Sequence, residues 1–361
     1  MAQDQPQQPQ PPPQQPPAKP AAPAPATASA PGCGLDLGTM NLVSARQTGG
    51  NQIETKRIRD VFIDLDIETK KTLRLSQVDY VEQGDTLVVL GDPALNMANL
   101  FKREVRRPLS HGIISSAELE AQQILSLLIE NVLGKPVSPN EHCFYSVPAE
   151  PVDDVGQDII YHTEVFRKIL TELGYTPHPM NEAMAIIYSQ CMNENFSGLA
   201  ASFGSGMMNI ALSYQTVKGL DFALARCGDW VDAHAAKAIG STASRMCAIK
   251  EKGVDLSNPT NREEEAIALY IRALIKYCLD NIAVQFKKVQ AAIDLPDPVP
   301  FVVSGGTSKA NGFMKVFTEE FEAVKRRGFP IEISEIRTAR DPMTAVAEGL
   351  LVLAMEEHAD G

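Results

Sequence analysis

The stretch that most constrains the fold is residues 34–41, GLDLGTMN, followed at once by a second strand-like run at 42–46. The apolar approach ends in Asp36, and Gly38 and Thr39 follow. This order predicts a tight β-hairpin whose tip exposes backbone N–H groups to an anion, because glycine permits the necessary backbone angles. Asp36 stands where it can face a hydrated divalent cation. An ordinary hairpin turn is the alternative, since these residue types are common in turns.

A second unit of the same kind occupies residues 199–212, LAASFGSGMMNIAL. An apolar strand again leads into a glycine-spaced turn, and a further strand follows directly. The third glycine and the helix of a dinucleotide-binding fingerprint are missing, so a Rossmann fold is excluded. Two such units indicate two related halves, each with a phosphate-binding loop.

Composition limits the classes of function. The 361 residues are 44% hydrophobic, enough for two domains with sizeable cores. The net charge of -12, without a long Lys/Arg run, argues against nucleic acid as a partner. No apolar stretch reaches the roughly 20 residues of a membrane span. The N-terminus lacks a secretory signal, and the six cysteines are scattered without a C-x-x-C pair, so we expect a reduced, cytoplasmic protein.

Residues 1–31 form a low-complexity tail that holds eleven of the 25 prolines, together with Gln and Ala. Such a segment has too little apolar surface to fold and is expected to be disordered. It reads either as a solvated spacer or as a ligand for a proline-binding partner. It has no amphipathic face, so membrane attachment is not indicated.

Periodicity predicts the remaining elements. A strong amphipathic helix is expected at 116–133, capped by Ser116 with Glu118 and Glu120 in its first turn. We interpret the basic cluster at 102–107 as part of the exposed surface. The alternative is a contact with phosphate or with another subunit. Further helices are expected at 93–100, 159–173, 226–239, 263–289, 311–322 and 343–355, and further strands at 60–66, 86–90, 142–147, 217–225, 301–304 and 331–333.

The pair Asn181 and Glu182 is delivered onto the first turn of an apolar helix. A carboxylate there is stabilised by the helix N-terminus, so Glu182 reads as a cap. The alternative is a rigidly held carboxylate that orients an attacking water.

In their order and spacing these motifs resemble the actin superfamily, which includes actin, sugar kinases and the seventy-kilodalton heat-shock chaperones. MreB-type bacterial actins are the most similar, and the resemblance covers residues 32–354. The matching segments are the first phosphate loop (36–41), an MreB-type segment (107–114), the first connector (181–185), the second phosphate loop (202–206), the adenosine loop (303–308) and the second connector (341–349).

The resemblance implies an α/β, two-domain actin-like fold, a duplicated ribonuclease H-like unit with a nucleotide cleft between the halves, behind a disordered tail. Domain I would span 32–180 and be rejoined by 340–361. Domain II would span 181–339, with its outer subdomain shortened at 250–263.

The resemblance also implies ATP or ADP and Mg²⁺ as cofactors. Asp36 would hold the metal through water and act in catalysis, and Glu182 would orient the hydrolytic water. Arg245 is a candidate for the base or ribose edge. The phosphates and adenosine would be held by Gly38, Thr39, Met40, Asn41, Gly204, Ser205, Gly206, Met207, Gly305, Gly306 and Thr307.

The chain departs from the family pattern in its second phosphate loop. Ser202 and Asn209 stand where acids are usual, Met207 replaces a Thr or Gln, and the pair Gly228-Asp229 retains part of a Gly-Gly-Asp pattern. Fewer carboxylates offer less charge to Mg²⁺. We therefore expect ATP binding with slow hydrolysis.

The resemblance predicts an MreB-like, ATP-binding cytoskeletal protein that polymerises with itself and acts as a slow Mg²⁺-dependent ATPase. The alternative is a monomeric, chaperone-type nucleotide switch or pseudo-ATPase that binds a protein partner. A sugar kinase is disfavoured because no sugar-site insert is found.

Overall fold

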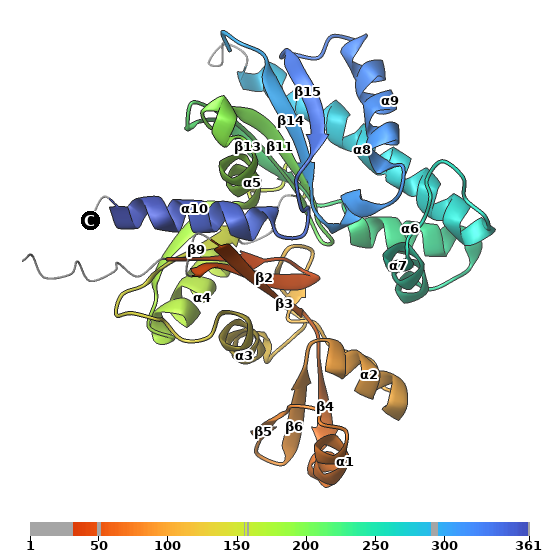
Figure 1. The fold of residues 1–361 in the computed structure, drawn as a ribbon. Helices are drawn as coiled ribbons and strands as arrows, with labels where there is room; N and C mark the ends of the chain where they lie inside the picture. The colour runs from red at the N-terminus through yellow and green to blue at the C-terminus, as the bar shows by residue number, and fades with distance from the viewer. Residues whose placement is uncertain (1–31, 49–51, 155, 157–158, 290–294, 360–361) are drawn as a thin grey trace, which may run out of the picture.

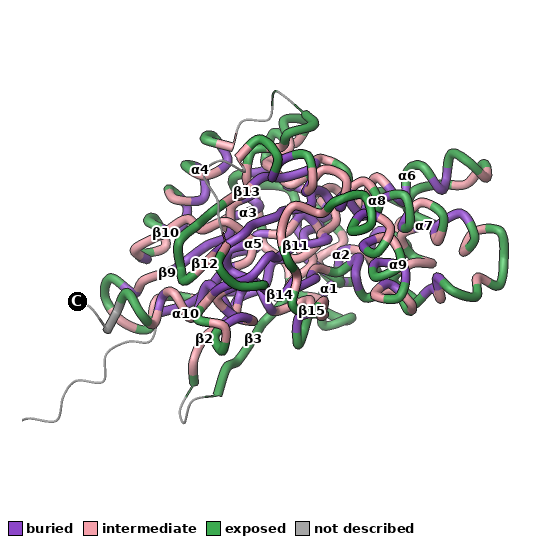
Figure 2. The backbone as a smooth tube through the Cα atoms, turned by 90° about the horizontal axis from the view of Figure 1, so that it is seen from above, coloured by how far each residue is buried: buried purple, intermediate pink, exposed green. Residues whose placement is uncertain are grey.

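The computed structural model describes residues 32–48, 52–154, 156, 159–289 and 295–359. Two five-stranded mixed sheets, each with its own helices, form the body of the molecule (Figure 1). Buried residues concentrate in these sheets and in the helices between them, while the outer helices carry exposed faces (Figure 2). The expected disorder of the tail concerns residues outside the described part of the chain.

The first sheet has the order β10-β9-β1-β2-β3. The predicted hairpin forms, with β1 antiparallel to β2, while β9 runs parallel to both β1 and β10. Helices α3 and α4 cover one face of the sheet and α10 the other (Figure 1). The elements are β1 (Cys33–Leu37), β2 (Asn41–Thr48), β3 (Gln52–Arg59), β9 (His142–Val147), β10 (Thr176–Asn181), α3 (Ala121–Leu133), α4 (Ile159–Glu172) and α10 (Ala345–Ala359).

The second sheet repeats this arrangement in the order β15-β14-β11-β12-β13. Its β11–β12 hairpin is antiparallel, and β14 runs parallel to β11, as β9 does to β1. The equivalence confirms two related halves. The elements are β11 (Gly198–Phe203), β12 (Met208–Tyr214), β13 (Val217–Leu224), β14 (Val299–Ser304), β15 (Ile333–Thr338), α6 (Gly228–Ile239), α8 (Arg262–Val289) and α9 (Phe313–Lys325).

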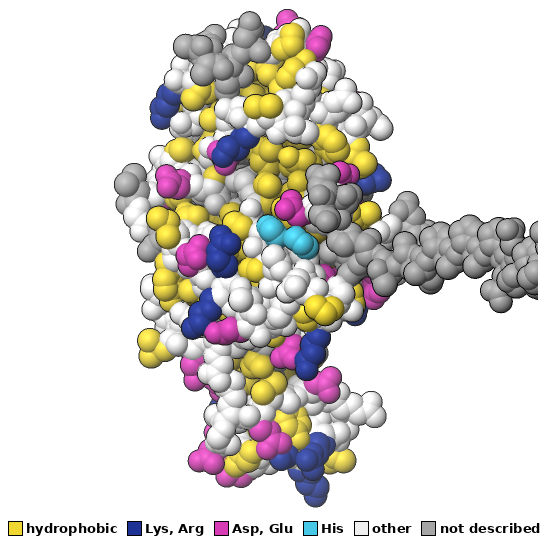
Figure 3. Space-filling model, turned by 90° about the vertical axis from the view of Figure 1, so that its left-hand side faces the viewer, with side chains coloured by type: hydrophobic (Ala, Val, Ile, Leu, Met, Phe, Trp, Pro, Cys, Tyr) yellow, Lys and Arg dark blue, Asp and Glu magenta, His cyan; other side chains and the backbone are white. Residues whose placement is uncertain are grey.

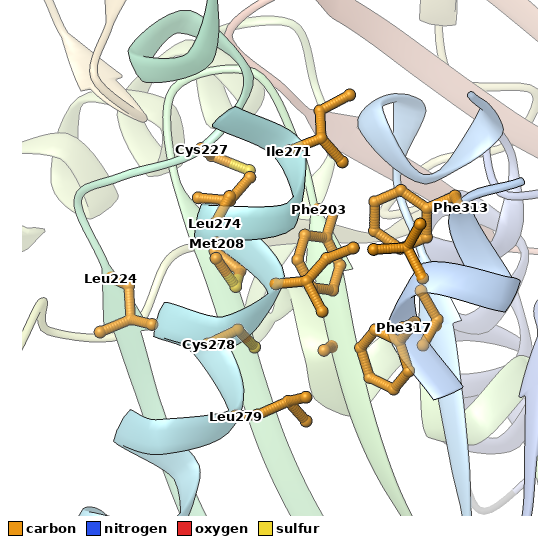
Figure 4. Packing of buried hydrophobic residues seen from close by; sticks show 14 of the residues in the cluster. Phe203, Met208, Leu224, Cys227, Ile271, Leu274, Cys278, Leu279, Phe313 and Phe317 are labelled. Atoms are coloured by element: carbon orange, nitrogen blue, oxygen red, sulfur yellow. The ribbon is translucent and has the colours of Figure 1, made fainter. Parts of the chain in front are cut away.

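The core of the second half lies between its sheet and the helices α8 and α9 (Figure 4). Phe203 from β11 meets Phe313 of α9 edge to face, with ring centroids 5.2 Å apart. Leu274 and Cys278 project from α8 into the same cluster. Because Phe203 directly precedes the second glycine turn, this packing fixes the position of the turn.

Helix α5 (Glu182–Gln190) lies between the two halves. It packs against α10 and also contacts β11 and β12 of the second sheet. The backbones approach closely, because a Cβ on Gly349 would lie 1.7 Å from the carbonyl oxygen of Ala185. The two connecting helices therefore form one layer that joins the sheets.

Smaller elements surround this body. A three-stranded sheet with two helices projects from the first half, at the bottom of Figure 1. These elements are β4 (Phe62–Asp66), β5 (Val81–Gln83), β6 (Thr86–Leu90), α1 (Lys70–Leu75) and α2 (Asp92–Phe101); the others are the hairpin β7 (Leu109–Ser110) and β8 (Ile113–Ile114), α7 (Ala243–Lys252) and the 3-10 turns η1 (Ile67–Thr69), η2 (Met192–Glu194) and η3 (Gly306–Lys309).

Two predicted elements were wrong in detail. Helix α3 begins at Ala121, its cap position is Glu120 without a side-chain hydrogen bond, and Ser116 caps nothing. Strand β15 covers 333–338 instead of 331–333 because it pairs in parallel with β14. Strands β3, β5, β7, β8 and β10 and helices α1 and α7 were not predicted.

Acidic and basic side chains are interspersed on the face shown in Figure 3, with apolar side chains between them. Within the described residues, none of the helices combines the length and the apolar character that crossing a bilayer requires.

Candidate functional site

The two glycine hairpins meet at one cavity with a volume of about 470 Å³. This volume lies in the range of small-molecule sites. The first half contributes the β1–β2 turn and the tip of the β7–β8 hairpin. The second half contributes the β11–β12 turn, η3 and one face of α7.

The structure brings together the predicted site residues, with one exception. The predicted residues that line the cavity are Asp36, Gly38, Thr39, Met40, Asn41, Glu182, Gly204, Ser205, Gly206, Met207, Gly305, Gly306 and Thr307. Arg245 does not line it: its guanidinium binds Glu263, with Nη2 to Oε1 at 2.9 Å, on the exposed side of α7. The expectation that Arg245 reaches the base or ribose is corrected accordingly.

Helix α7 presents other residues instead. Cys247, Lys250 and Glu251 line the cavity and are spaced three and four positions apart, which puts them on one face of a helix. This spacing was visible in the sequence once α7 was assigned. Lys250 Nζ donates to Asp232 Oδ2 at 2.8 Å and to the carbonyl oxygen of Gly228 at 3.0 Å, so the amine is fixed at the cavity wall.

The tips of the two hairpins are in direct contact. A Cβ on Gly206 would lie 2.4 Å from the Gly112 nitrogen and 2.6 Å from Thr39 Oγ1. Gly112 N in turn donates to Thr39 Oγ1 at 3.1 Å. Position 206 therefore requires glycine for packing, and the β7–β8 hairpin bridges the two loops.

The loop at 303–308, expected to hold adenosine, also depends on glycine. Gly305 has a φ of +92°, and a Cβ there would lie 2.4 Å from the Phe203 carbonyl oxygen. Thr307 Oγ1 donates to the carbonyl oxygen of Gly204 at 2.7 Å. These contacts hold η3 against the second phosphate loop, so both form one wall of the cavity.

Asp36 is partly buried at the end of β1. Its Oδ1 accepts a hydrogen bond from Ser146 Oγ at 2.9 Å, and Ser146 Oγ accepts one from the backbone nitrogen of Leu37 at 2.7 Å. Burial raises the pKa of Asp36 to about 6, although the bond from Ser146 acts in the opposite direction. A nearby cation would stabilise the ionised form of a carboxyl held in this way.

Glu182 is the second carboxyl of the cavity. The capping role expected for it belongs to Asn181, whose Oδ1 accepts from the backbone nitrogens of Ala183 at 2.9 Å and Met184 at 3.1 Å. Burial, and then the charge of Asp36, raise the pKa of Glu182 to about 8, while Asn209 and Ser202 beside it lower that pKa. Both causes disfavour the ionised form of the Glu182 carboxyl, and a bound cation would favour it.

The residues present fit Mg²⁺ bound together with a phosphate chain. Among the described residues there is no cluster of three or more His, Cys, Asp or Glu side chains for a metal. Mg²⁺ commonly uses one or two carboxylates with water and substrate phosphates, which Asp36 and Glu182 match. The cationic side chains that line the cavity, and so suit phosphates, are Arg57, Arg59, Lys250 and Lys309.

The family is decided by sequence. The sequence model of a protein family described as Volactin matches residues 32–354. The chain belongs to the Volactin family. No curated protein matches this Volactin-family chain.

Solved structures show the fold of this Volactin-family chain. The "MamK double helical filament" aligns with a TM-score of 0.66 at 19% identity, covering 89% of this chain and 98% of that chain. MreB5 of Spiroplasma citri bound to AMPPNP aligns with a TM-score of 0.63 at 15% identity, covering 91% of this chain and 97% of that chain. The ethanolamine utilization protein EutJ from Carboxydothermus hydrogenoformans aligns with a TM-score of 0.51 at 17% identity, covering 89% of each chain. The predicted actin-like fold of MreB type is confirmed.

Proposed function

We propose that this Volactin-family protein binds an adenine nucleotide with Mg²⁺ in the cavity between its halves, hydrolyses it slowly and assembles with copies of itself into filaments. The observation that carries the proposal is the convergence of two glycine hairpins and two carboxyls, Asp36 and Glu182, on one cavity. MamK, similar in fold, is a double helical filament, and MreB5 of Spiroplasma citri is bound to AMPPNP, which supports both parts of the proposal.

The hairpin tips supply the anion-binding groups. Backbone N–H groups around Gly38 and Gly206 hold the phosphates from opposite sides, so the donors are in place before the nucleotide arrives. Bound Mg²⁺ would neutralise charge on the phosphates. Asp36 would hold the hydrated cation, and Glu182 would orient the attacking water through its carboxyl.

The second loop explains why turnover is slow. Ser202 and Asn209 offer neutral groups beside Glu182. Without a second loop carboxylate the cavity presents less negative charge to the cation, which lowers metal affinity and turnover more than phosphate binding.

Sedimentation and negative-stain microscopy with ATP, ADP and no nucleotide test assembly. We expect pelletable filaments with ATP and Mg²⁺. A monomer under all conditions contradicts the filament proposal. Calorimetry tests binding separately: heat from ATP should be saturable and absent in Asp36→Ala, whereas no heat from any purine nucleotide contradicts nucleotide binding.

The second candidate is a monomeric nucleotide switch of chaperone type that binds a protein partner. The neutral residues Ser202 and Asn209 favour it, because a switch can function with little turnover. Size-exclusion chromatography with light scattering decides between the two: a monomer whose binding of a partner depends on nucleotide supports the switch.

A further inference from the structure

A second concave site lies away from the nucleotide cavity, between α6 and α8. It is a groove of about 230 Å³ whose lining includes Arg226, Trp230 and Tyr277. None of its residues lines the nucleotide cavity. Trp, Tyr and Arg are the residues most enriched at the energetic centres of protein interfaces.

The aromatic walls of this groove are held in place by the protein itself. The Tyr277 hydroxyl donates to Asp153 Oδ2 at 2.7 Å. The guanidinium of Arg226 lies 4.4 Å from the Tyr277 ring centroid and 5.7 Å from that of Trp230. Trp230 also packs on Tyr270, with centroids 5.6 Å apart. Walls fixed before binding reduce the ordering cost of a ligand.

This groove suits a ligand of definite chemistry. Grooves walled by Trp and Tyr bind polyproline helices, whose proline rings pack on the aromatic faces. The backbone carbonyls of such a helix make no internal hydrogen bonds and are free to accept. The Trp230 ring nitrogen donates to no acceptor within the part of the chain that the structure describes, so it is available for a ligand carbonyl.

The chain carries such a ligand in its own tail. Prolines 6, 9 and 12 are spaced three residues apart, and so are prolines 17, 20 and 23. A polyproline helix has three residues per turn, so the prolines of each set share one face. Lys19 is the only charged residue between positions 6 and 23, which favours burial against apolar rings.

We propose that the groove between α6 and α8 binds the proline-rich segment, residues 6–23, of a second copy of this chain. Gly32, where the described chain begins, packs against Ala354 near the end of α10. That end of α10 and helix α6 lie on opposite sides of the molecule (Figure 1). At about 3.1 Å per residue, 31 residues extend roughly 95 Å, long enough to reach a neighbouring copy. The interaction is independent of the nucleotide site.

Trp230 is the single tryptophan of the chain, so its fluorescence reports on the groove alone. The acceptor is the full-length protein with prolines 6, 9, 12, 17, 20 and 23 replaced by alanine, which leaves the groove free. A synthetic peptide of residues 1–31 is titrated into it. The matched control is the same peptide with the same six prolines changed to alanine.

We expect a saturable change in Trp230 emission with the natural peptide and at least a tenfold weaker response with the control peptide. Tyr277→Leu, checked for folding by thermal melting, should weaken binding of a fluorescein-labelled natural peptide at least tenfold in anisotropy. Equal responses to the two peptides, or no saturable response to either, overturn the proposal.

The wild-type chain distinguishes the source of the segment. Its Trp230 emission should change with protein concentration, because the ligand comes from a second copy, and the six-proline variant should not show this change. A difference between the two proteins that is the same at every concentration shows binding within one chain and overturns the assignment to a second copy.

Discussion

Arg59 and Glu251 form a two-pronged ion pair at the cavity between the two halves although 192 positions separate them in the sequence. Arg59 Nη1 donates to Glu251 Oε1 at 2.8 Å, and Nη2 donates to Oε2 at 3.4 Å. Arg59 ends β3 of the first half, and Glu251 lies on α7 of the second; both line the cavity. The pair therefore ties the two halves together at the wall of the cavity proposed to bind the nucleotide.

Breaking this pair should speed nucleotide release. Both side chains are partly exposed, 21% and 42%, and such pairs contribute about 0.2–1 kcal/mol. We expect Glu251→Gln to raise the release rate of a fluorescent ADP up to about fivefold in stopped flow, with the difference shrinking at high salt.

Arg59 offers a matched control, because its Nε also donates to Asp92 Oδ1 at 3.0 Å within the first half. Asp92→Asn should leave the release rate unchanged. Arg59→Gln and the double variant complete a cycle that separates the pair from any direct nucleotide contact. Strictly additive effects would show that the pair does not restrain release.

Glu182→Gln tests the catalytic carboxyl. Glutamine keeps the shape of the side chain but has no ionised form and cannot accept a proton from water. We expect the ATP turnover rate to fall by about 10²–10⁴, the usual contribution of acid–base groups, with the nucleotide dissociation constant little changed. Phosphate release and calorimetry measure the two quantities, and equal turnover in both proteins removes Glu182 from the mechanism.

Ser202→Asp tests the weakened second loop. Ser202 is buried beside Glu182, so a third carboxyl there adds like charge to Asp36 and Glu182. We expect the thermal midpoint to fall without Mg²⁺ and to recover with it, together with faster Mg²⁺-dependent turnover. Ser202→Asn, close to aspartate in size but neutral, should keep the Mg²⁺ dependence of the wild-type protein; identical behaviour of the two variants contradicts this reading of the loop.

Both glycine hairpins were predictable because the residues that build them are local in sequence. Gly38 and Gly206 mark turns by residue type alone, and the apolar strands on each side fix the pairing. That the turns lie together could be inferred only from the resemblance to actins. The pairing of Arg59 with Glu251 could not be predicted, since it joins β3 and α7, and neither element was predicted.

The reasons for the missed elements are physical. Strand β3 is polar and mostly exposed, so its sequence shows no alternation of apolar and polar residues. It is a strand because its backbone pairs with β2. Residues 116–120 have the composition of a helix start, but Arg106 Nε binds Glu118 Oε2 at 2.8 Å and Nη2 binds Glu120 Oε2 at 3.0 Å. These long-range ion pairs hold the segment outside α3 and leave Leu119 96% exposed.

His162 makes stability depend on pH. It is buried on α4 against Phe166, and neither ring nitrogen has a hydrogen-bond partner within the described residues. Burial lowers its pKa from 6.5 to about 4. Between pH 4 and pH 6.5 the unfolded chain binds a proton at His162 that the folded protein does not bind. The free energy of unfolding is therefore unaffected by His162 above pH 6.5 and falls as the pH drops toward 4.

The free energy of unfolding changes by about 1.4 kcal/mol per pH unit between the two pKa values, which gives roughly 3 kcal/mol in total. We expect the wild-type urea midpoint to decline faster between pH 6.5 and 4.5 than that of His162→Leu, which fills the same apolar site without a titrating group. Carboxylates that titrate in both proteins cancel in the difference. A difference between the two midpoints that stays constant with pH would show that His162 protonates without unfolding its surroundings.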